Sequence, residues 1–430
     1  MARVKLTPSL RLCGLGAIML IALVACAFRG TSAASFLVPM AVACVAYLLA
    51  IRELLRTPTF PRRVVLICLA LAAVWRVPFL MTPLGPKDDI ARYLWDGRVQ
   101  RFGYNPYAVI PADPAFSGLH TRETRGLNNA DVPTPYPAGA QLFFRAVTAI
   151  HESVSAFKIA FALCDLAIVL LLLNMLHRDG KGEHWVLAYA WHPLLATEVA
   201  GSGHIDIVGV LLLLISVAAL ERRWLAIAAS AFALAVAVKF LPLVLIPLYW
   251  RRLRIRDGLL AVLVFTVLYM PFLNSGRIPV GSLFIFVQRF RFNGPAFAAL
   301  ERVASPQIVV ALAILAGLVT AVALRGKPPQ CESDAWAWPM AASLVCAPVV
   351  YPWYLLWVLP FLRSLTTLPL TVWTLSIFST YLVWYLRPLG HAWQVPGWIL
   401  LLEYGSVVTA ALIVWFHWRA RAATSTATAH

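Results

Sequence analysis

Long apolar runs with few charges are the feature that most restricts what this chain can fold into. Six of them reach 18 residues or more: 12–29, 63–82, 155–177, 257–274, 305–324 and 397–417. A run of this length spans about 30 Å of hydrocarbon as a helix, and backbone groups in lipid must pair within the segment. Charged residues make up only 13% of the 430, too few to cover a soluble particle. The sequence therefore predicts an all-α polytopic membrane protein with about 12 to 14 passes, several of them short or broken.

The net charge of +17 follows the topology of these runs. Arginines gather in short connections between apolar segments, at Arg52, Arg56, Arg62, Arg63, Arg222, Arg223, Arg251, Arg252, Arg254, Arg256, Arg419 and Arg421. The positive-inside rule places these connections and the basic N-terminus in the cytoplasm, and residues 82–138 outside. For this sidedness to hold, residues 224–250 must form a short hairpin that turns near Lys239. Such a distribution argues against a nucleic-acid partner.

The chain reads as one membrane domain over residues 1–420, followed by a disordered tail at 421–430 that is rich in Ala and Thr. No internal repeat or separate soluble domain is visible. The first apolar run lacks a convincing cleavage site and a second run follows at once, so we expect a retained signal anchor.

Two polar stretches, residues 82–138 and 275–304, interrupt the hydrophobic pattern. Each contains a segment with the pattern of an amphipathic helix on the membrane surface, IARYLWDGRVQRFG at 90–103 and GSLFIFVQRFRF at 281–292. We expect the two segments to face each other and to roof a cavity between the membrane helices.

The first polar stretch begins with two carboxylates, Asp88 and Asp89, where the third apolar segment leaves the membrane. Positive charges follow and precede them on the same short segment, at Lys87, Arg92, Arg98 and Arg101. Sugar transfer from a phosphate needs a group that takes the acceptor hydroxyl's proton and positive charge that holds the departing phosphate. Asp beside Arg supplies both. The later acidic residues of this stretch, Asp113, Glu123 and Asp131, have the context of ordinary solvent-exposed charges.

The predicted sidedness also restricts the sugar donor. Nucleotide sugars are cytoplasmic, whereas residues 82–138 face the other side. The activated sugar should therefore arrive on a lipid, and a polyprenyl phosphosugar meets this condition. A groove between membrane helices would bind its isoprenoid tail.

Three other groups of residues are candidates for substrate contacts. His204 and Asp206 lie in the connection GSGHID, residues 201–206, which is preceded by Glu198. They can bind acceptor or share proton transfer; alternatively, the connection is only a polar hairpin turn.

Lys239 lies at the expected outer turn of its hairpin, where a cation needs an anion such as a lipid phosphate. A snorkelling lysine is the alternative. The YPWY motif places Tyr351, Trp353 and Tyr354 at an outer boundary, either to stack on a sugar ring or as part of an aromatic belt. Charges inside apolar runs, Arg76, Asp165 and Glu403, are expected to be structural partners within the bundle.

The segment KDDIARYLWDGRVQRFGYNPY, residues 87–107, resembles the GT-C superfamily of polyprenyl-phosphosugar-dependent glycosyltransferases, and within it the bacterial mannosyltransferase-like branch grouped as glycosyltransferase family 87. Further similarity lies in Tyr136-Pro137 followed by Gln141, in WHP...GSGHIDIV at 191–208, in VKFLPLVLIPL around Lys239 and in YPWYLLWVLPF from Tyr351. One departure is Ala138 after Tyr136-Pro137, where relatives show a second proline.

The resemblance implies a GT-C-like bundle with two extracytoplasmic juxtamembrane helices, inversion at the anomeric carbon, and no metal or other cofactor. In the superfamily the catalytic aspartate stands four residues before a tyrosine, which implies Asp89 before Tyr93, with Asp88 as the second choice. The residues expected to contact substrate are Lys87, Arg92, Tyr93, Asp96, Arg98, Asn105, Tyr107, Tyr136, Gln141, His204, Asp206, Lys239, Tyr351, Trp353 and Tyr354.

The reaction that this resemblance implies moves a hexose, by family default mannose, from a polyprenyl phosphate to a lipid or glycan acceptor. It takes place at the outer face of a bacterial inner membrane. A lipid-linked sugar transporter or flippase is the alternative, since broken helices and buried charges also mark transport pathways. A transferase of phosphoethanolamine or acyl groups would need a nucleophilic Ser or Thr or a zinc cluster, and neither pattern is present.

Overall fold

The computed structural model describes residues 7–28, 30, 32–83, 89–275, 279–326 and 332–427. Over these residues the chain is mainly helical, and the isolated bridge between extended segments joins Phe292 to Val349. The expected all-α polytopic fold is confirmed.

In the described part of the chain, eight helical segments are long and apolar enough to cross a membrane. They are α1 (Pro8–Ala27), α2 (Ala33–Arg56), α3 (Arg62–Leu80), α6 (Val154–Arg178), α11 (Ile255–Tyr269) continued by η5 (Met270–Ser275), α14 (Pro306–Leu324), the succession η8 (Leu365–Thr367), α16 (Leu368–Ser376), η9 (Ile377–Tyr381), α17 (Leu382–Leu386) and η10 (Arg387–Leu389), and α18 (Gly397–Ala427). Most of them expose large hydrophobic side chains such as Ile21 and Leu263. Lipid is therefore their solvent.

Shorter elements pack between these spans. They are η2 (Glu183–Trp185), α7 (Val186–Ala190), η3 (Leu195–Gly201), α8 (Asp206–Glu221), α9 (Leu225–Val238), η4 (Leu241–Leu245), α10 (Ile246–Tyr249), α15 (Glu332–Val345) and η7 (Pro352–Phe361). The π-helical η3 and α8 form an apolar pair of helices bent by 113° at a short break, the geometry of a broken span or a re-entrant loop. By length and composition the described residues thus contain eight spans, or nine if this pair is one span, fewer than the expected twelve to fourteen; Ala138–Ile150, Leu225–Val238 and Pro352–Phe361 are shorter apolar helices.

The turn expected near Lys239 is present, and it begins where α9 ends. The helix α9 ends at Val238, and Lys239 itself is extended, with φ −157° and ψ 139°. The chain then continues into η4 and α10 and reaches the basic connection after Tyr249. A 14-residue helix rises only about 21 Å, so this pass is shorter than a full span.

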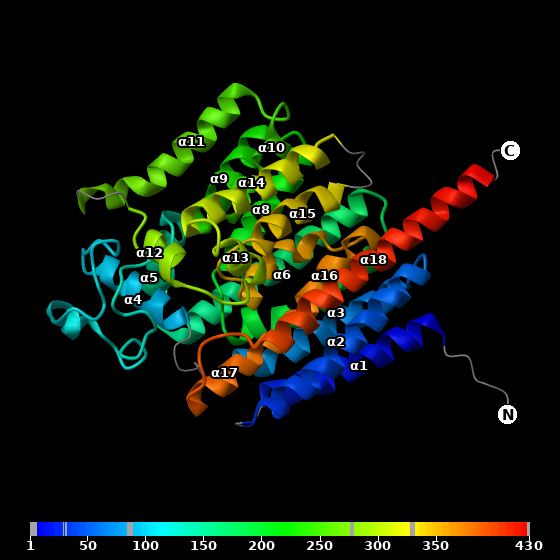
Figure 1. Ribbon diagram of the computed structural model, residues 1–430, viewed down its shortest axis with the longest axis horizontal. Coiled ribbons are helices and arrows are strands. Elements are labelled where there is room, and N and C mark those ends of the chain that lie inside the picture. Colours follow the sequence, from blue (N-terminus) through cyan, green and yellow to red (C-terminus); the bar gives the residue numbers. More distant parts are fainter. Residues whose placement is uncertain are drawn as a thin grey trace.

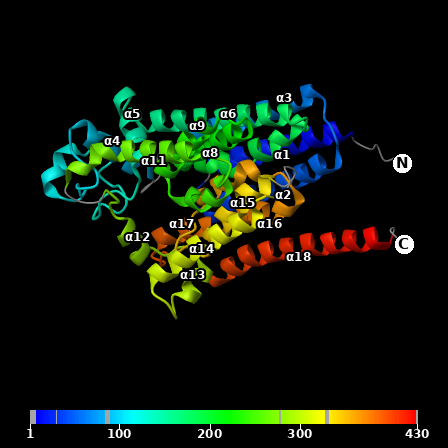
Figure 2. The same ribbon diagram turned by 90° about the horizontal axis from the view of Figure 1, so that it is seen from above.

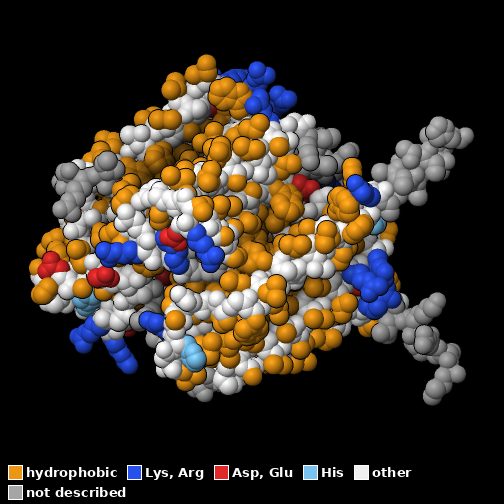
Figure 3. Space-filling model, viewed as in Figure 1, with side chains coloured by type: hydrophobic (Ala, Val, Ile, Leu, Met, Phe, Trp, Pro, Cys, Tyr) orange, Lys and Arg blue, Asp and Glu red, His pale blue; other side chains and the backbone are white. Residues whose placement is uncertain are grey.

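The two ends of the molecule differ in composition. At one end lie α4 (Asp89–Arg101), α5 (Ala138–Ile150), α12 (Leu283–Arg289) and the irregular segment 102–137 with η1 (Pro114–Leu119); α13 (Pro295–Leu300) follows α12. The start of α1 and the end of α18 lie at the other end (Figures 1 and 2). Hydrophobic side chains cover the middle of the face in Figure 3, and Lys and Arg gather toward its edges. The last helix continues to Ala427, through most of the segment expected to be a tail.

The first expected amphipathic helix does form, as α4, and most of it is buried against other segments of the chain. Ten of its residues are buried. Its Gly97 approaches α5 so closely that a Cβ there would lie 2.6 Å from the carbonyl oxygen of Phe144. The buried residues of α4 are covered by α5, which packs along it, and by the segment 102–137. In α12, by contrast, Phe284 is 58% exposed.

The charges within the spans have polar partners: Arg76 and Asp165 form an ion pair, and Glu403 accepts from neutral donors. The guanidinium of Arg76 lies 2.7 Å from Asp165, whose other carboxylate oxygen accepts from the Tyr189 hydroxyl at 2.9 Å. The carboxylate of Glu403 accepts from the indole of Trp373 at 2.8 Å. Buried charges of this kind are tolerated because each has a partner.

Candidate active site

Asp89 is the first residue of α4, and its carboxylate is 20% exposed. The amide of Asn128, from the irregular segment, donates to its Oδ1 at 3.3 Å. The amino end of a helix favours negative charge because its first N–H groups have no partners within the helix. Asp89 is therefore a positioned and accessible carboxylate at the end of the molecule that is opposite to the start of α1 and the end of α18.

The break between η3 and α8 brings His204 beside this carboxylate. Its Nε2 lies 3.9 Å from Oδ2 of Asp89, and its Nδ1 lies 3.1 Å from both Oε2 and the carbonyl oxygen of Glu198. Gly203 makes the turn possible, since its φ of +69° lies in the left-handed region that favours glycine. With Nδ1 donating to Glu198, Nε2 is left to face Asp89.

A second ion pair lies next to Asp89, His204 and Glu198. The ammonium of Lys239 is 2.6 Å from Oδ1 of Asp206, which also accepts from the indole of Trp357 at 2.7 Å. The same ammonium lies 3.5 Å from the ring centroid of Tyr354. A quarter of the Lys239 side chain is exposed, so it can reach an anionic ligand.

We call Asp89, Glu198, His204, Asp206 and Lys239 the charged cluster. The charges of Asp89 and Asp206 both act on Lys239 and on His204. Three carboxylates, one imidazole and one ammonium are thus collected from α4, from the break between η3 and α8, and from the end of α9.

Aromatic rings from the YPWY motif form one wall of the cluster. The indole of Trp353 stacks on the imidazole of His204, with centroids 3.9 Å apart and planes 9° from parallel. The ring of Tyr351 in turn stacks on Trp353, with ring centroids 4.4 Å apart. The sequence-predicted residues Tyr351, Trp353 and Tyr354 are therefore brought to the cluster, although they follow it by more than a hundred residues.

Two tyrosines close the cluster from the side of α4. The hydroxyl of Tyr93 accepts from the backbone N–H of Ile205 at 3.4 Å, and its ring lies 5.2 Å from that of Tyr136 in a T-shaped arrangement. Burial, together with the nearby Asp89 charge, raises the pKa of both phenols well above the ordinary value. Both remain neutral and can donate hydrogen bonds.

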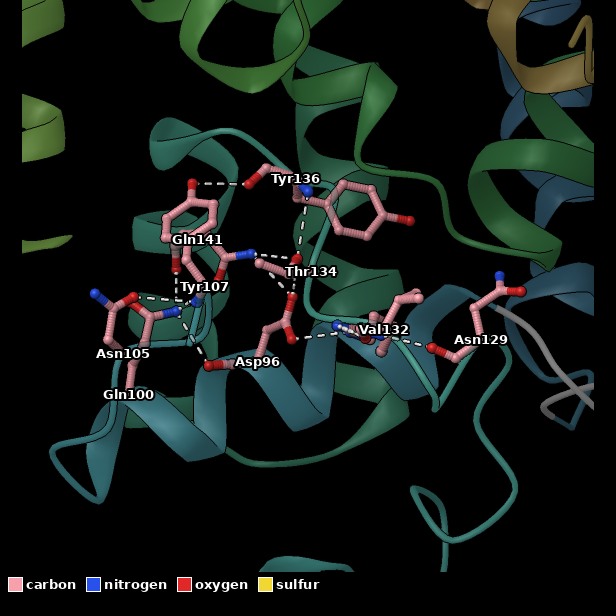
Figure 4. A network of polar contacts seen from close by, with 10 residues as sticks. Asp96, Gln100, Asn105, Tyr107, Asn129, Val132, Thr134, Tyr136 and Gln141 are labelled. Atoms are coloured by element: carbon pink, nitrogen blue, oxygen red, sulfur yellow. Dashed lines mark hydrogen bonds and ion pairs between the residues drawn. The ribbon is translucent and has the colours of Figure 1, made fainter. Parts of the chain in front are cut away.

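Other predicted residues form a separate network that fastens α4 to the irregular segment (Figure 4). Oδ2 of Asp96 accepts from the Thr134 hydroxyl at 2.6 Å and from the Gln141 amide at 2.9 Å, while Oδ1 lies 3.0 Å from Nε of Arg92. The guanidinium of Arg92 also donates to two backbone carbonyls of the irregular segment. Arg92 and Asp96 are almost fully buried, so the structure does not bring them or Gln141 into the charged cluster.

Three further predicted residues also hold the fold of this end. Arg98 pairs with Glu152 at 2.7 Å, the Asn105 amide donates to the carbonyl of Phe272 at 2.8 Å, and the Tyr107 hydroxyl donates to the carbonyl of Tyr136 at 2.8 Å. The arginines expected to clamp phosphate beside Asp89 are thus committed to carboxylates and carbonyls. Lys87 and Asp88 lie outside the described residues.

Sequence reasoning missed two residues that shape this site. Trp357 shares Asp206 with Lys239, and its position four residues after Trp353 in a tryptophan-rich run was an available signal. Asn128 lies in a stretch without a recognisable motif, so nothing in the sequence pointed to it. Glu198 was noticed only as a neighbour of the GSGHID connection.

The arrangement provides a base, a proton-holding imidazole, an ammonium and a flat aromatic wall. Carboxylates can accept a hydroxyl proton, ammonium can neutralise a phosphate, and indole rings pack on sugar faces. Among the described residues, no three His, Cys, Asp or Glu side chains converge in the manner of a metal site.

A sequence model for the N-terminal domain of the alpha-(1->6)-mannopyranosyltransferase family matches residues 13–252. This range contains the whole charged cluster but not the YPWY motif. No curated protein and no solved structure gives a match. The expected membership of a GT-C-like mannosyltransferase family is confirmed. Because the match covers more than half of the chain, this membrane protein belongs to the alpha-(1->6)-mannopyranosyltransferase family and is a mannosyltransferase.

Proposed function

We propose that the chain moves a mannosyl group, with inversion, from a polyprenyl phosphate to a lipid or glycan acceptor at the outer face of a bacterial inner membrane. The observation that carries this proposal is the position of Asp89, an accessible carboxylate at a helix amino terminus with His204 3.9 Å away. The ammonium of Lys239 supplies the positive charge for the leaving phosphate.

The sidedness of the site supports a lipid-borne donor. The helix α4, which begins at Asp89, lies at the end opposite to the start of α1 and the end of α18 (Figure 2). In α8, Asp206 is the first residue, and Arg222 and Arg223 follow the other end. By the positive-inside rule the end with Asp89 and Asp206 faces away from the cytoplasm. Nucleotide sugars are absent from this outer side. A polyprenyl phosphosugar provides both an activated sugar and a hydrocarbon anchor.

In the proposed reaction the acceptor hydroxyl oxygen attacks C1 of the mannosyl group while the bond from C1 to the phosphate oxygen breaks. Asp89 takes the hydroxyl proton, and the polyprenyl phosphate leaves with the bonding electron pair. Lys239 faces the phosphate, and His204, held by Glu198, stabilises the ionised form of Asp89 before the proton is transferred. One displacement from the opposite face inverts the anomeric carbon.

The test uses purified protein with a synthetic polyprenyl phosphomannose and a panel of lipid and glycan acceptors, with products identified by mass spectrometry. A parallel reaction contains a nucleotide mannose. We expect product only from the lipid donor, and at least a ~100-fold lower rate for Asp89→Asn. The matched control is Asp131→Asn, an exposed aspartate of the same irregular segment. Failure to consume any lipid phosphosugar, with every acceptor, would exclude the proposal.

Sidedness has its own test. A cysteine at position 89 in intact cells should react with a membrane-impermeant maleimide added from outside. Reaction only after the inner membrane is opened would place the site in the cytoplasm and remove the argument for a lipid donor. A flippase would transport lipid-linked sugar equally well with Asp89→Asn, whereas a transferase would lose product.

A further inference from the structure

A large basic cavity lies at the end of α8 that is opposite to Asp206. Its volume is about 1320 Å³, and it is bounded by the ends of α6, α8 and η7 and by the turns before α9 and α11. The 16 residues of α8 separate it from the charged cluster by about 24 Å. It is therefore a separate site from the one proposed for sugar transfer.

The cavity carries a strong excess of positive charge. Eight lysine and arginine side chains line it, against two carboxylates, Asp179 and Glu221. Both carboxylates are already paired with Arg178. The excess of cations over carboxylates therefore gives the cavity a positive potential.

Three of these cations have no internal partner. Among the described residues, the side chains of Arg223, Arg251 and Arg363 make no hydrogen bond or ion pair. Burial lowers the pKa of the Arg363 guanidinium below its ordinary value, and the charges of Glu221 and Asp179 offset this effect only in part. The positive-inside rule accounts for basic residues at this end, but it does not account for unpaired ones that converge on one cavity.

The backbone at two of these arginines is unusual. Arg223 and Arg251 have φ values of +57° and +66°, in the left-handed region that glycine or asparagine normally occupies. Arg223 lies in the turn from α8 to α9, and Arg251 lies in the turn from α10 to α11. A long cationic side chain thus stands at each of two tight turns where a smaller residue would be less strained.

The other half of the wall is apolar. Trp185, Trp336 and Phe361 line the cavity together with leucines from α6, α8 and the start of α9. A cavity lined by both guanidinium groups and apolar side chains fits a ligand that has a phosphate at one end and hydrocarbon at the other.

We propose that this basic cavity binds a phosphate-bearing anion, with the phosphate held by Arg223, Arg251 and Arg363 and attached hydrocarbon lying along the apolar wall. A membrane lipid with an anionic headgroup and a soluble phosphate compound share this recognition chemistry. The experiment distinguishes the two sources, and it does not depend on mannosyl transfer.

The purified full-length protein is titrated with phosphatidylglycerol or phosphatidylcholine in detergent, and bound lipid is counted by native mass spectrometry. Sodium pyrophosphate is the soluble probe. We expect at least tenfold tighter binding of phosphatidylglycerol than of phosphatidylcholine. Displacement of the lipid by pyrophosphate would show that the phosphate alone is recognised; lipid that stays bound would show that the apolar wall contributes. Equal binding of the two lipids would overturn the proposal.

The decisive variant is Arg223→Asn/Arg251→Asn, because asparagine suits a left-handed backbone. The lipid-free variant should unfold at the same or a higher temperature, yet bind phosphatidylglycerol at least tenfold more weakly. The matched control, Arg62→Gln/Arg63→Gln, removes two exposed charges outside the cavity and should bind normally. Arg363→Gln, which leaves both turns unchanged, should also weaken binding. Equal losses in the control and the cavity variants would reduce the effect to net charge and refute the site.

Discussion

The ammonium nitrogen of Lys239 lies 2.6 Å from Oδ1 of Asp206, although 33 residues separate them. Asp206 begins α8, and Lys239 follows directly on the last residue of α9. The two helices are antiparallel neighbours joined by a short turn, so the start of one lies beside the end of the other. The pair therefore places the charged cluster at the end of the α8–α9 hairpin where α8 begins and α9 ends.

Replacing Lys239 by Met should lower both stability and activity. The carboxylate of Asp206 would lose its cation, at a cost of about 2 kcal/mol, less than for a fully buried pair because Lys239 is partly exposed. The double variant Lys239→Met/Asp206→Asn should regain most of the stability in thermal unfolding but not the rate of mannosyl transfer. A double variant with normal activity would show that Lys239 does not face the phosphate.

Glu198→Gln should reduce kcat by about 10- to 100-fold with little change in KM. The amide cannot hold the proton on Nδ1 of His204 as a carboxylate does, so the imidazole beside Asp89 would lose its charge more readily as pH rises. The measured quantity is the pH dependence of kcat, whose alkaline limb should move to lower pH. An unshifted profile would assign Glu198 to structure only.

The aromatic wall should act on binding. Trp353→Ala removes the ring that stacks on His204 and should raise KM for the donor or acceptor about tenfold, whereas Trp353→Phe should have a smaller effect. Trp250→Ala, at an exposed position outside the cluster, is the control for loss of an indole. Initial rates at varied substrate concentration separate KM from kcat.

Asp96 and Asp89 lie on the same helix but should respond differently to substitution by asparagine. Asp96→Asn leaves the buried guanidinium of Arg92 without a carboxylate, which should destabilise the protein by about 3 kcal/mol. Its activity should recover on cooling, in step with the folded fraction. Asp89→Asn should unfold at the wild-type temperature and stay inactive at every temperature. If Asp96→Asn is well folded and still inactive, Asp96 has a direct role in the active site and the structural assignment is wrong.

Gly203→Ala should disturb the start of α4, which contacts Gly203 although it lies far from it in the sequence. An added Cβ would lie 2.4 Å from Cδ1 of the buried Ile90, at a backbone with φ +69°. Together the strain and overpacking should cost about 2 to 4 kcal/mol. Gly103→Ala, with φ +84° but open space around it, should show the smaller cost of backbone strain alone. Equal unfolding temperatures for the two variants would contradict the proposed contact with Ile90.

The candidate site was only partly readable from the sequence. Asp88 and Asp89 were predicted because an ionisable group at membrane level usually marks a site, and the resemblance favoured Asp89 by its spacing to Tyr93. His204 and Asp206 were predicted because they are expected at the same membrane level. The pairing of these groups was not readable, since it depends on which helix ends meet. The same limit explains why Arg92 and Arg98 were expected beside a phosphate, whereas the fold commits them to Asp96 and Glu152.

By itself the sequence determined that lipid is the solvent, that helices are the only structure for most of the chain, and which end carries the positive charge. These properties follow from the local composition of each segment, because the hydration of its side chains and the pairing of its backbone groups do not depend on distant segments. Only the tertiary structure decided that Asp89, His204 and Lys239 share one site, and that unpaired arginines share one cavity. Whether a charge is paired or available depends on contacts between distant segments, which no local pattern encodes.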